Sequence, residues 1–398
     1  MRAIPTFSVA RLPDIRFGAG RLKETAEVAA QYGSKALLVT GGRSFVSTPH
    51  WQQLQDALKA KGVAWEWLQV TQEPSPHLVD EAVAKYLKAG IQVVVGVGGG
   101  SVLDAAKAIA GLLISGHSVM NYLEGVGHGM VYEGPALPFI AVPTTAGTGS
   151  EATKNAVLSL QGDTGFKKSF RHDALVARVA IVDPDLLASC PQELIAANGM
   201  DAFTQLLESY VSLNASPFTD ALAWSGLEAF RDGFWTAWDP AHPHRSEGLS
   251  SIAYASLLSG ITLAQAGLGS VHGLAAPLGA YFPIPHGVAC GTLVAEATAV
   301  NIHALRARDP HARTLRKYAQ VGRLLSGVQG NDDNAAADML VRLLHSWAER
   351  LKLPRLGAFG MSEEQVDKVV ENCRGGSMRT NPILLNYEEL AQLLLARL

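Results

Sequence analysis

Short apolar runs alternate with amphipathic segments through the first half of the chain. Four runs have the length and the β-branched content of buried strands: Lys35–Thr40, Val63–Val70, Ile91–Val97 and Pro138–Pro143. Segments with helical periodicity lie between them: Trp51–Lys61, Leu78–Ala89 and Leu103–Ile114. Strands and helices that alternate at this spacing predict an α/β fold with a doubly wound, Rossmann-like parallel sheet.

The second half has a different pattern, in which helical periodicity dominates and no convincing strand occurs. The clearest helical segments are Gln192–Leu213, Phe218–Phe234, Leu249–Ala266, Ala335–Leu351 and Tyr387–Leu398. We therefore expect two domains: an α/β domain over residues 1–187 and an all-helical domain over residues 188–398.

One long stretch, residues 248–295, contains no Asp, Glu, Lys or Arg, although 17% of the whole chain is charged. Such a stretch is normally buried. Glycines, prolines and polar side chains interrupt it, which favours buried helices of a soluble domain over a membrane span. It holds His272 and His286. A buried imidazole must be hydrogen-bonded or must bind something, so these two histidines are the first candidates for chemistry.

The overall composition narrows the class of protein. The chain has 398 residues, 48% of them hydrophobic, and a net charge of −3. No cluster of Lys and Arg stands out, so nucleic acid is not an expected partner. Cys190, Cys290 and Cys373 lack metal-binding or disulfide spacing and are expected to be reduced core thiols. The first residues contain charges and prolines where a signal peptide needs an apolar run, and we expect a cytoplasmic protein.

A run of glycines follows the third predicted strand, where a helix begins at Gly98-Gly99-Gly100-Ser101. Free backbone N–H groups at a helix start attract phosphate, and glycines allow a pyrophosphate to approach closely. The alternative is a tight turn that needs positive φ and binds no ligand. The spacing differs from the GxGxxG fingerprint, so the motif alone leaves both interpretations open.

A second loop of small residues follows the fourth predicted strand and carries Thr144, Thr145, Thr148 and Ser150. Its hydroxyls would suit the phosphates or the ribose of a nucleotide, although a polar loop without a ligand explains them equally well. Both loops follow strands of one parallel sheet. They are therefore expected at its carboxyl edge, where open α/β sheets bind their ligands.

Asp201 follows Asn198-Gly199-Met200, where we expect a long helix to begin. A carboxylate there commonly interacts with the free amides of the first turn. The alternative is that Asp201, His272 and His286 converge as one oxygen and two nitrogen ligands, a set that suits Zn²⁺ or Fe²⁺ with an open position for substrate. Gln205 would lie on the same helix face as Asp201. Spacing alone does not decide between these interpretations.

Five motifs occur in order along the chain: GGGSVLDAAK (98–107), PTTAGTGSEAT (143–153), VDPDLL (182–187), NGMDAFTQLLESYVS (198–212) and HGLAAPLGAYFPIPHG (272–287). Together they resemble the iron-containing, group III alcohol dehydrogenases. That family includes glycerol dehydrogenases, butanol dehydrogenases and maleylacetate reductases, and it is related to dehydroquinate synthase. The resemblance runs nearly end to end. It implies a dehydroquinate synthase-like fold, with cofactor and metal in the cleft between the two domains.

The resemblance implies metal ligands at Asp201, Gln205, His272 and His286, with Asp201, His272 and His286 as the catalytic centre. The family usually has His where Gln205 stands, and often a further His where this chain has Ala276. An amide oxygen is a weaker ligand for a transition metal than an imidazole. We therefore expect Fe²⁺ or Zn²⁺ to be held mainly by three residues, with no obvious side chain to relay a proton.

The same resemblance implies a nicotinamide cofactor. Members that prefer NAD usually carry an Asp after the first strand. Here that position is Gly41, followed by Gly42, Arg43 and Ser44. Without the carboxylate a 2′-phosphate is not repelled, and Arg43 and Ser44 could bind it, so we expect NADP in preference to NAD. The other cofactor-binding positions that the resemblance implies are Gly98, Gly99, Gly100, Ser101, Asp104, Thr144, Thr145, Thr148, Ser150, Lys167 and Leu186.

The expected reaction is hydride transfer between NAD(P)(H) and a small alcohol or aldehyde, catalysed by a metal-dependent homo-oligomer, a dimer or larger. Two alternatives are a metal-independent reductase of an acidic substrate, similar to the maleylacetate reductases, and a nucleotide-binding protein without catalysis. The first is less favoured because the segment around His272–His286 has no cationic residue to pair with a carboxylate.

Overall fold

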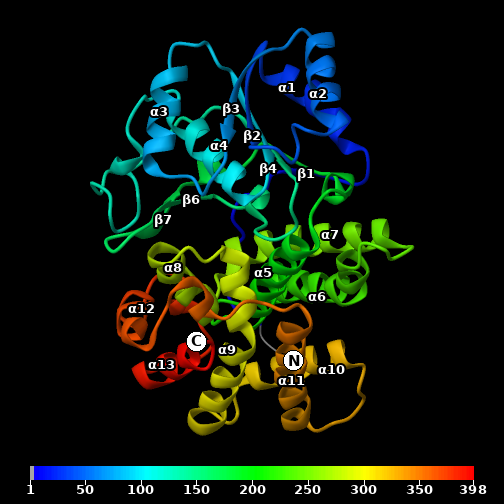
Figure 1. Ribbon diagram of the computed structural model, residues 1–398, viewed down its shortest axis with the longest axis vertical. Helices are drawn as coiled ribbons and strands as arrows, with labels where there is room; N and C mark the ends of the chain where they lie inside the picture. Colours follow the sequence, from blue (N-terminus) through cyan, green and yellow to red (C-terminus); the bar gives the residue numbers. More distant parts are fainter. Residues whose placement is uncertain (1–3) are drawn as a thin grey trace.

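The strand-like runs of the first half pair into a single six-stranded sheet. The computed structural model describes residues 4–398 and has its parallel strands in the order β1-β8-β5-β4-β2-β3. These are β1 (Asp14–Phe17), β2 (Lys35–Gly41), β3 (Ala64–Val70), β4 (Val93–Gly98), β5 (Phe139–Pro143) and β8 (Val179–Val182). The predicted doubly wound α/β architecture is confirmed (Figure 1).

Helices cover both faces of this sheet, and this explains why its central strands β2, β4, β5 and β8 are almost entirely apolar, whereas the edge strands β1 and β3 carry charged residues. The helices are α1 (Thr25–Tyr32), α2 (Pro49–Ala60), α3 (Pro76–Tyr86) and α4 (Gly100–Leu112). Successive side chains of a strand point to opposite faces. Accordingly, Leu38 packs in a core with α1 and α2, whereas its neighbours Leu37 and Val39 pack in a second core with α3 and α4.

A hairpin that the hydrophobic pattern does not predict lies beside the sheet. Its strands β6 (Asn155–Leu160) and β7 (Phe166–Arg171) pair antiparallel, and Ala156, Leu158 and Phe170 enter the core beneath α3 and α4. The opposite side of β7 carries Lys167 and Ser169 toward the second half of the molecule. The hairpin therefore contributes both to the core and to the junction between the two halves.

Among the described residues, the part of the chain after β8 contains helices and no strand, which confirms the predicted all-helical second half. Its α-helices are α5 (Gln192–Val211), α6 (Pro217–Trp238), α7 (Arg245–Ala266), α8 (Ser270–Tyr281), α9 (His286–Arg308), α10 (Arg313–Ser326), α11 (Asp333–Arg350), α12 (Val366–Asn372) and α13 (Tyr387–Leu395). We propose that the domain boundary lies at residues 187–188, between β8 and α5.

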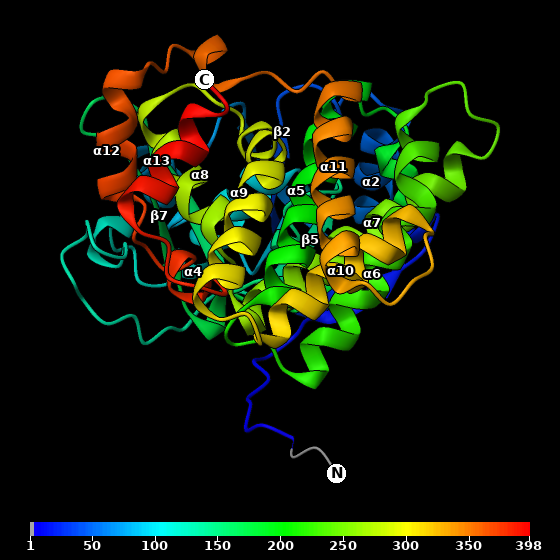
Figure 2. The ribbon, with the colours of Figure 1, turned by 90° about the horizontal axis from the view of Figure 1, so that it is seen from below.

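The charge-free stretch 248–295 forms most of α7, all of α8 and the first half of α9. Most of its side chains belong to the core of the helical half. Two helices, α7 and α9, are long and apolar enough to cross a membrane, yet 67% and 72% of their apolar windows are buried inside the molecule. Figure 2 shows α9 in the middle of the helical half, between α8 and α11. Burial inside the protein accounts for the composition of this stretch.

Candidate functional site

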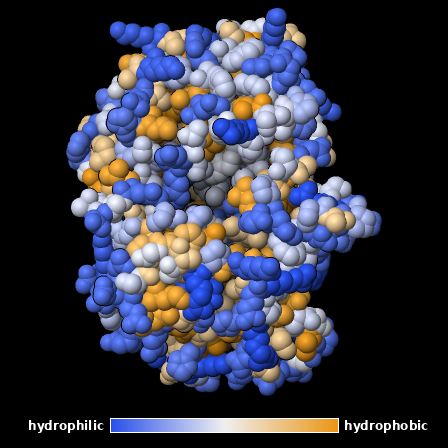
Figure 3. Space-filling model, in the orientation of Figure 1, coloured by the Kyte–Doolittle hydropathy of each residue, from blue (hydrophilic) through white to orange (hydrophobic). Residues whose placement is uncertain are grey.

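A cavity of about 630 Å³ lies between the sheet-containing half and the helical half. Its upper wall comes from the start of α4, the loop after β5 and the β6–β7 hairpin. Its lower wall comes from α5, α8 and the start of α9. Figure 3 shows a hollow at the junction of the two halves, with both hydrophobic and hydrophilic side chains around it. A ligand in this cavity would contact both halves of the chain.

The cavity lies next to the point where the sheet reverses its winding. The chain passes from β2 outward to β3, then returns to β4 on the other side of β2 and continues in the opposite direction. The loops after β2 and β4 therefore diverge at the carboxyl edge between these two strands. This crevice is where doubly wound sheets bind nucleotides.

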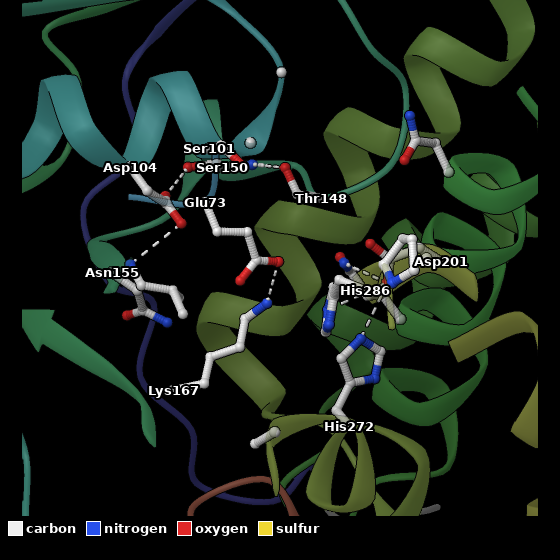
Figure 4. A pocket seen from close by; sticks show the side chains of 18 of the residues that line it. Glu73, Ser101, Asp104, Thr148, Ser150, Asn155, Lys167, Asp201, His272 and His286 are labelled. Atoms are coloured by element: carbon white, nitrogen blue, oxygen red, sulfur yellow. Dashed lines mark hydrogen bonds and ion pairs between the residues drawn. The ribbon is translucent and has the colours of Figure 1, made fainter. Parts of the chain in front are cut away.

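Many of the residues predicted to bind a cofactor lie together in this cavity. Its wall includes Gly99, Gly100, Ser101, Asp104, Thr145, Thr148, Ser150 and Lys167. Several are seen at close range in Figure 4. The remaining predicted positions lie outside the cavity wall: Gly41, Gly42, Arg43, Ser44, Gly98, Thr144 and Leu186. Arg43 and Ser44 are exposed at the end of β2, and Leu186 is packed in the core beside α1 and α2.

The glycines of the first loop are needed for close packing. None of the residues 98–100 has a positive φ, so the interpretation as a turn that needs left-handed backbone is wrong. A Cβ at Gly98 would lie 2.5 Å from the side chain of Val102, and a Cβ at Gly100 would lie 2.7 Å from that of Thr148. The two small-residue loops therefore lie directly against each other. No side chain caps the start of α4, so its first amides remain free to bind an anion.

A buried lysine that the sequence analysis did not single out holds the second loop in place. Lys107 Nζ donates to the carbonyl and hydroxyl oxygens of Ser150, at 2.9 Å each, and to Asn155 O at 2.6 Å. The Ser150 hydroxyl in turn donates to Asp104 Oδ1 at 2.6 Å. Lys107 ends the GGGSVLDAAK motif and lies one turn after Asp104. It therefore links α4 to the second loop from behind the cavity.

Asp201 lies in the middle of α5, nine residues after the helix begins at Gln192. The helix begins at Gln192, as the periodicity over Gln192–Leu213 predicts, and not at Asp201, so Asp201 has no free amide of a first turn to accept from. Its Oδ1 lies 3.2 Å from His272 Nε2 and 3.8 Å from His286 Nε2. Burial alone would raise the pKa of Asp201, but His286 and His272 lower it below its ordinary value.

His272 is oriented by a carboxylate that the sequence analysis missed. Glu208 Oε2 lies 2.6 Å from His272 Nδ1, and Glu208 Oε1 accepts from the backbone N–H of Val271 at 2.7 Å. With Nδ1 facing a carboxylate, Nε2 is directed at Asp201. Burial lowers the pKa of His272, but Cys290, Asp201 and Glu208 outweigh this and raise it well above its usual value. Glu208 is seven residues after Asp201, on the same face of α5.

His286 is the first residue of α9 and reaches Asp201 because α9 and α5 approach closely. A Cβ at Gly287 would lie 2.5 Å from Ala197 O, and a Cβ at Gly291 would lie 2.9 Å from Met200 Cβ. Among the described residues, His286 Nδ1 is buried without a hydrogen-bond partner. Burial lowers the pKa of His286, and the nearby Lys167 also contributes. A neutral imidazole here is able to act as a ligand.

Two further side chains touch this cluster. Gln205 Nε2 donates to Asp201 Oδ1 at 3.2 Å, while Gln205 Oε1 accepts from Ser259 Oγ at 2.9 Å. Cys290 Sγ lies 3.5 Å from His272 Nε2 and 3.8 Å from His286 Nε2. Burial raises the pKa of Cys290 to about 12. The sequence shows Cys290 one helical turn after His286, but it does not show that His272 lies beside it.

The cationic side chains of the cavity wall are paired with carboxylates. Lys167 Nζ lies 2.7 Å from Glu73 Oε1, and the Ser159 hydroxyl donates to Glu73 Oε2 at 2.7 Å. Figure 4 shows this pair between the start of α4 and the histidines. Arg171 lies 3.3 Å from Glu124. Burial raises the pKa of Glu73, but Lys167 and Ser159 outweigh it and keep the pKa below its usual value.

A parallel sheet with a cavity at its switch point, faced by a carboxylate and two imidazoles, is the arrangement expected of nucleotide-dependent oxidoreductases that use a metal ion. Residues 13–184 match the family described as "Iron-containing alcohol dehydrogenase". Residues 195–398 match "Fe-containing alcohol dehydrogenase family, C-terminal". The chain belongs to the iron-containing alcohol dehydrogenase family, as the sequence motifs predict.

Individual relatives agree with this assignment. The chain is 38% identical to "Long-chain-alcohol dehydrogenase 1" of Geobacillus thermodenitrificans over 284 residues, 70% of each chain. It is 29% identical to "NAD-dependent methanol dehydrogenase" of Bacillus methanolicus over 381 residues, 95% of this chain and 96% of the relative. The crystal structure of an archaeal halo-thermophilic alcohol dehydrogenase from a Red Sea brine pool superposes with a TM-score of 0.90 at 27% identity over 100% of both chains. The protein is accordingly an alcohol oxidoreductase, and neither sequence-based alternative is favoured.

Proposed function

We propose that Asp201, His272 and His286 hold the divalent metal ion of this enzyme, next to a nicotinamide cofactor bound along the two small-residue loops. The observation that carries the proposal is that both groups of residues face one cavity. The substrate we propose is an uncharged alcohol or aldehyde, which would enter between the cofactor and the metal.

The residues present fit a metal ion. Donor atoms of Asp201, His272, His286 and Cys290 lie within 4.8 Å of one another. One carboxylate and two imidazoles suit Zn²⁺ or Fe²⁺. The partner of His272 Nδ1 is a carboxylate, an arrangement typical of metal-bound histidines. A divalent ion here would act as a Lewis acid that stabilises the substrate alkoxide and polarises the carbonyl in the reverse direction.

The chain's own residues bind and orient the reactants. The free amides at the start of α4 and the hydroxyls of Thr145 and Thr148 would bind the cofactor phosphates and ribose. Glu208 fixes the ring of His272, so the donor set is pre-formed. Ala276 offers only a methyl group to the cavity. The alcohol proton would therefore leave through water or a cofactor hydroxyl.

The lining of the lower wall supports an uncharged substrate. It contains Leu194, Leu263, Leu268, Ala276, Pro283 and Ile284. The side-chain cations that line the cavity, Lys167 and Arg171, are already paired with carboxylates. An acidic substrate would have to displace those carboxylates and then leave its own charge beside apolar surface, which is unfavourable.

We propose NADP as the preferred form of the cofactor, with Fe²⁺ or Zn²⁺ as the metal. The absence of a carboxylate at Gly41 and the exposed Arg43 support NADP, whereas the NAD-dependent methanol dehydrogenase among the relatives represents the opposite preference. We also propose that the protein is cytoplasmic and forms a homo-oligomer. Size-exclusion chromatography with light scattering would test the oligomeric state.

The proposal is tested by metal content and turnover on one sample. Protein purified without chelators is expected to carry about one Fe or Zn per chain and to reduce uncharged aldehydes with NAD(P)H. His272→Ala is expected to lose both the metal and the activity, because it removes a ligand. His345→Ala, which replaces a histidine on α11 outside the cavity, should retain both. Full activity of a metal-free sample would contradict the proposal.

A further inference from the structure

Cys290 lies one turn after His286 on α9, and its side chain is completely buried. Its Sγ is 3.5 Å from His272 Nε2 and 3.8 Å from His286 Nε2. In a tetrahedral zinc site the Zn–N bond is near 2.0–2.1 Å and the Zn–S bond near 2.3 Å. These bonds place a nitrogen and a sulfur ligand about 3.5 Å apart, and a nitrogen and an oxygen ligand about 3.3 Å apart. The Asp201–His272 separation of 3.2 Å fits the second value. The thiol is therefore spaced from both imidazoles as a fellow ligand would be.

Cys290 also lies on the correct side of the cluster. Asp201, His272 and His286 line the cavity, whereas Cys290 is not part of its wall. The sulfur therefore faces the cluster from behind, on the side away from the substrate. Four protein ligands complete a tetrahedral site, so the substrate oxygen would bind as a fifth ligand from the cavity side, the expansion to five-coordination that catalytic zinc sites can undergo.

Gln205 occupies the position where the family motif has a fourth ligand, but its side-chain oxygen faces Ser259 and not the cluster. Gln205 Oε1 accepts from Ser259 on α7, and the amide nitrogen is the atom that faces Asp201. Nitrogen of a neutral amide is not a metal ligand in proteins, because its lone pair is delocalised and it acts as a donor. In this arrangement Gln205 orients the carboxylate of Asp201.

We infer that Cys290 is a ligand of the metal ion, so that the donor set is one carboxylate, two imidazoles and one thiolate. The inference rests on the proposed function, since it concerns the same ion. On binding, the Cys290 thiol transfers its proton to solvent and the metal takes the place of that proton. A sulfur ligand favours Zn²⁺ over the harder Mg²⁺ and Mn²⁺.

X-ray absorption at the zinc edge of the full-length, zinc-loaded protein tests the inference without measuring activity. The wild type is expected to show a sulfur shell near 2.3 Å beside nitrogen and oxygen near 2.0–2.1 Å. Cys290→Ser should lose the sulfur shell. Cys373→Ser, which changes a buried cysteine outside the cluster, should keep it. A wild-type spectrum with only nitrogen and oxygen neighbours would overturn the inference.

Chelator competition adds an independent measurement. Cys290→Ser is expected to weaken zinc binding by tenfold or more, and Cys373→Ser to leave it unchanged. Gln205→Leu should weaken it less than Cys290→Ser, and the reverse order would make Gln205 the fourth ligand and overturn the inference. Failure of the wild type to bind any metal would instead contradict the proposed function. Binding through nitrogen and oxygen alone would leave that function intact.

Discussion

Gly41 ends β2, and a side chain at this position would point toward the first turn of α4. A Cβ there would lie 3.8 Å from Val102 Cγ2, an ordinary contact, and the backbone does not require glycine. Packing and backbone conformation would therefore both tolerate a side chain at this position. The absence of a carboxylate at Gly41 is not a requirement of the fold, and it bears on which cofactor can bind.

Gly41→Asp is expected to shift the cofactor preference from NADP toward NAD by about tenfold or more in the ratio of kcat/KM values. The new carboxylate would repel a 2′-phosphate and bind the ribose hydroxyls. Steady-state kinetics with both cofactors measure this ratio, and Gly375→Asp, at an open position without a positive φ, provides the control. If the ratio does not move in Gly41→Asp, the loop after β2 does not bind the adenosine ribose.

At the scale of single residues, the sequence identifies His272 and His286 through their charge-free surroundings and Asp201 through its motif. It does not identify Glu208 or Cys290 as their neighbours. Both lie at helical spacing from a predicted ligand, but this spacing also describes many core residues. Only the packing of α5, α8 and α9 shows that Glu208 contacts His272 and that Cys290 lies within 4 Å of both histidines.

The contact between α5 and α9 determines whether the proposed ligands Asp201 and His286 can meet. Gly287 and Gly291 face α5 and leave no room for a side chain. An apolar side chain at Gly287 would contact backbone, which cannot rotate away. The approach of the two helices therefore depends on two glycines that are one turn apart.

Gly287→Ala is expected to destabilise the protein by about 1–3 kcal/mol, since overpacking forces backbone shifts. It should also weaken metal binding, because His286 and Cys290 would move away from Asp201 with α9. Urea denaturation and chelator competition measure the two effects. Gly375→Ala, at a position with no neighbour within 4 Å, should change neither. Unchanged metal affinity in Gly287→Ala would show that the contact between α5 and α9 does not set the ligand geometry.

At the scale of elements, the sequence predicts the central strands and most of the amphipathic helices but not α1, α8, α9, α10, α12 or the β6–β7 hairpin. The helices α8 and α9 are apolar on most sides because other helices surround them, so they lack the periodicity of a surface helix. The hairpin carries Lys167 and Lys168 on β7, and its strands lack the apolar runs of the central sheet. Of the elements that the sequence does not predict, α8, α9 and the hairpin build the cavity.

At the scale of the whole molecule, the site exists only where the two halves meet. Gly149, with φ 60°, lies against the backbone of Gly260 on α7, and a Cβ on either residue would clash with the other. The sequence predicts the fold of each half but not this contact, because no local pattern records which surfaces meet. Next to it, Glu151 is buried in a small space lined by residues of β5, β8 and α7.

Burial raises the pKa of Glu151 to about 7, despite the nearby Lys107. In an unfolded chain this carboxyl ionises near its ordinary value of 4.5. Between these two values the unfolded state has released the proton and the folded state still holds it. The free energy of unfolding therefore falls as the pH rises through this window, and the loss is complete above pH 7.

Glu151→Gln removes this titration while keeping the size of the side chain. The stability of the wild type relative to the variant is expected to fall by about 2–3 kcal/mol between pH 5 and pH 8. Urea denaturation at both pH values measures the difference. Glu363→Gln, at an exposed position on the surface, should show no such pH dependence. A difference that stays constant with pH would mean that Glu151 is ionised in the folded protein, and that water or a cation reaches the junction between the two halves.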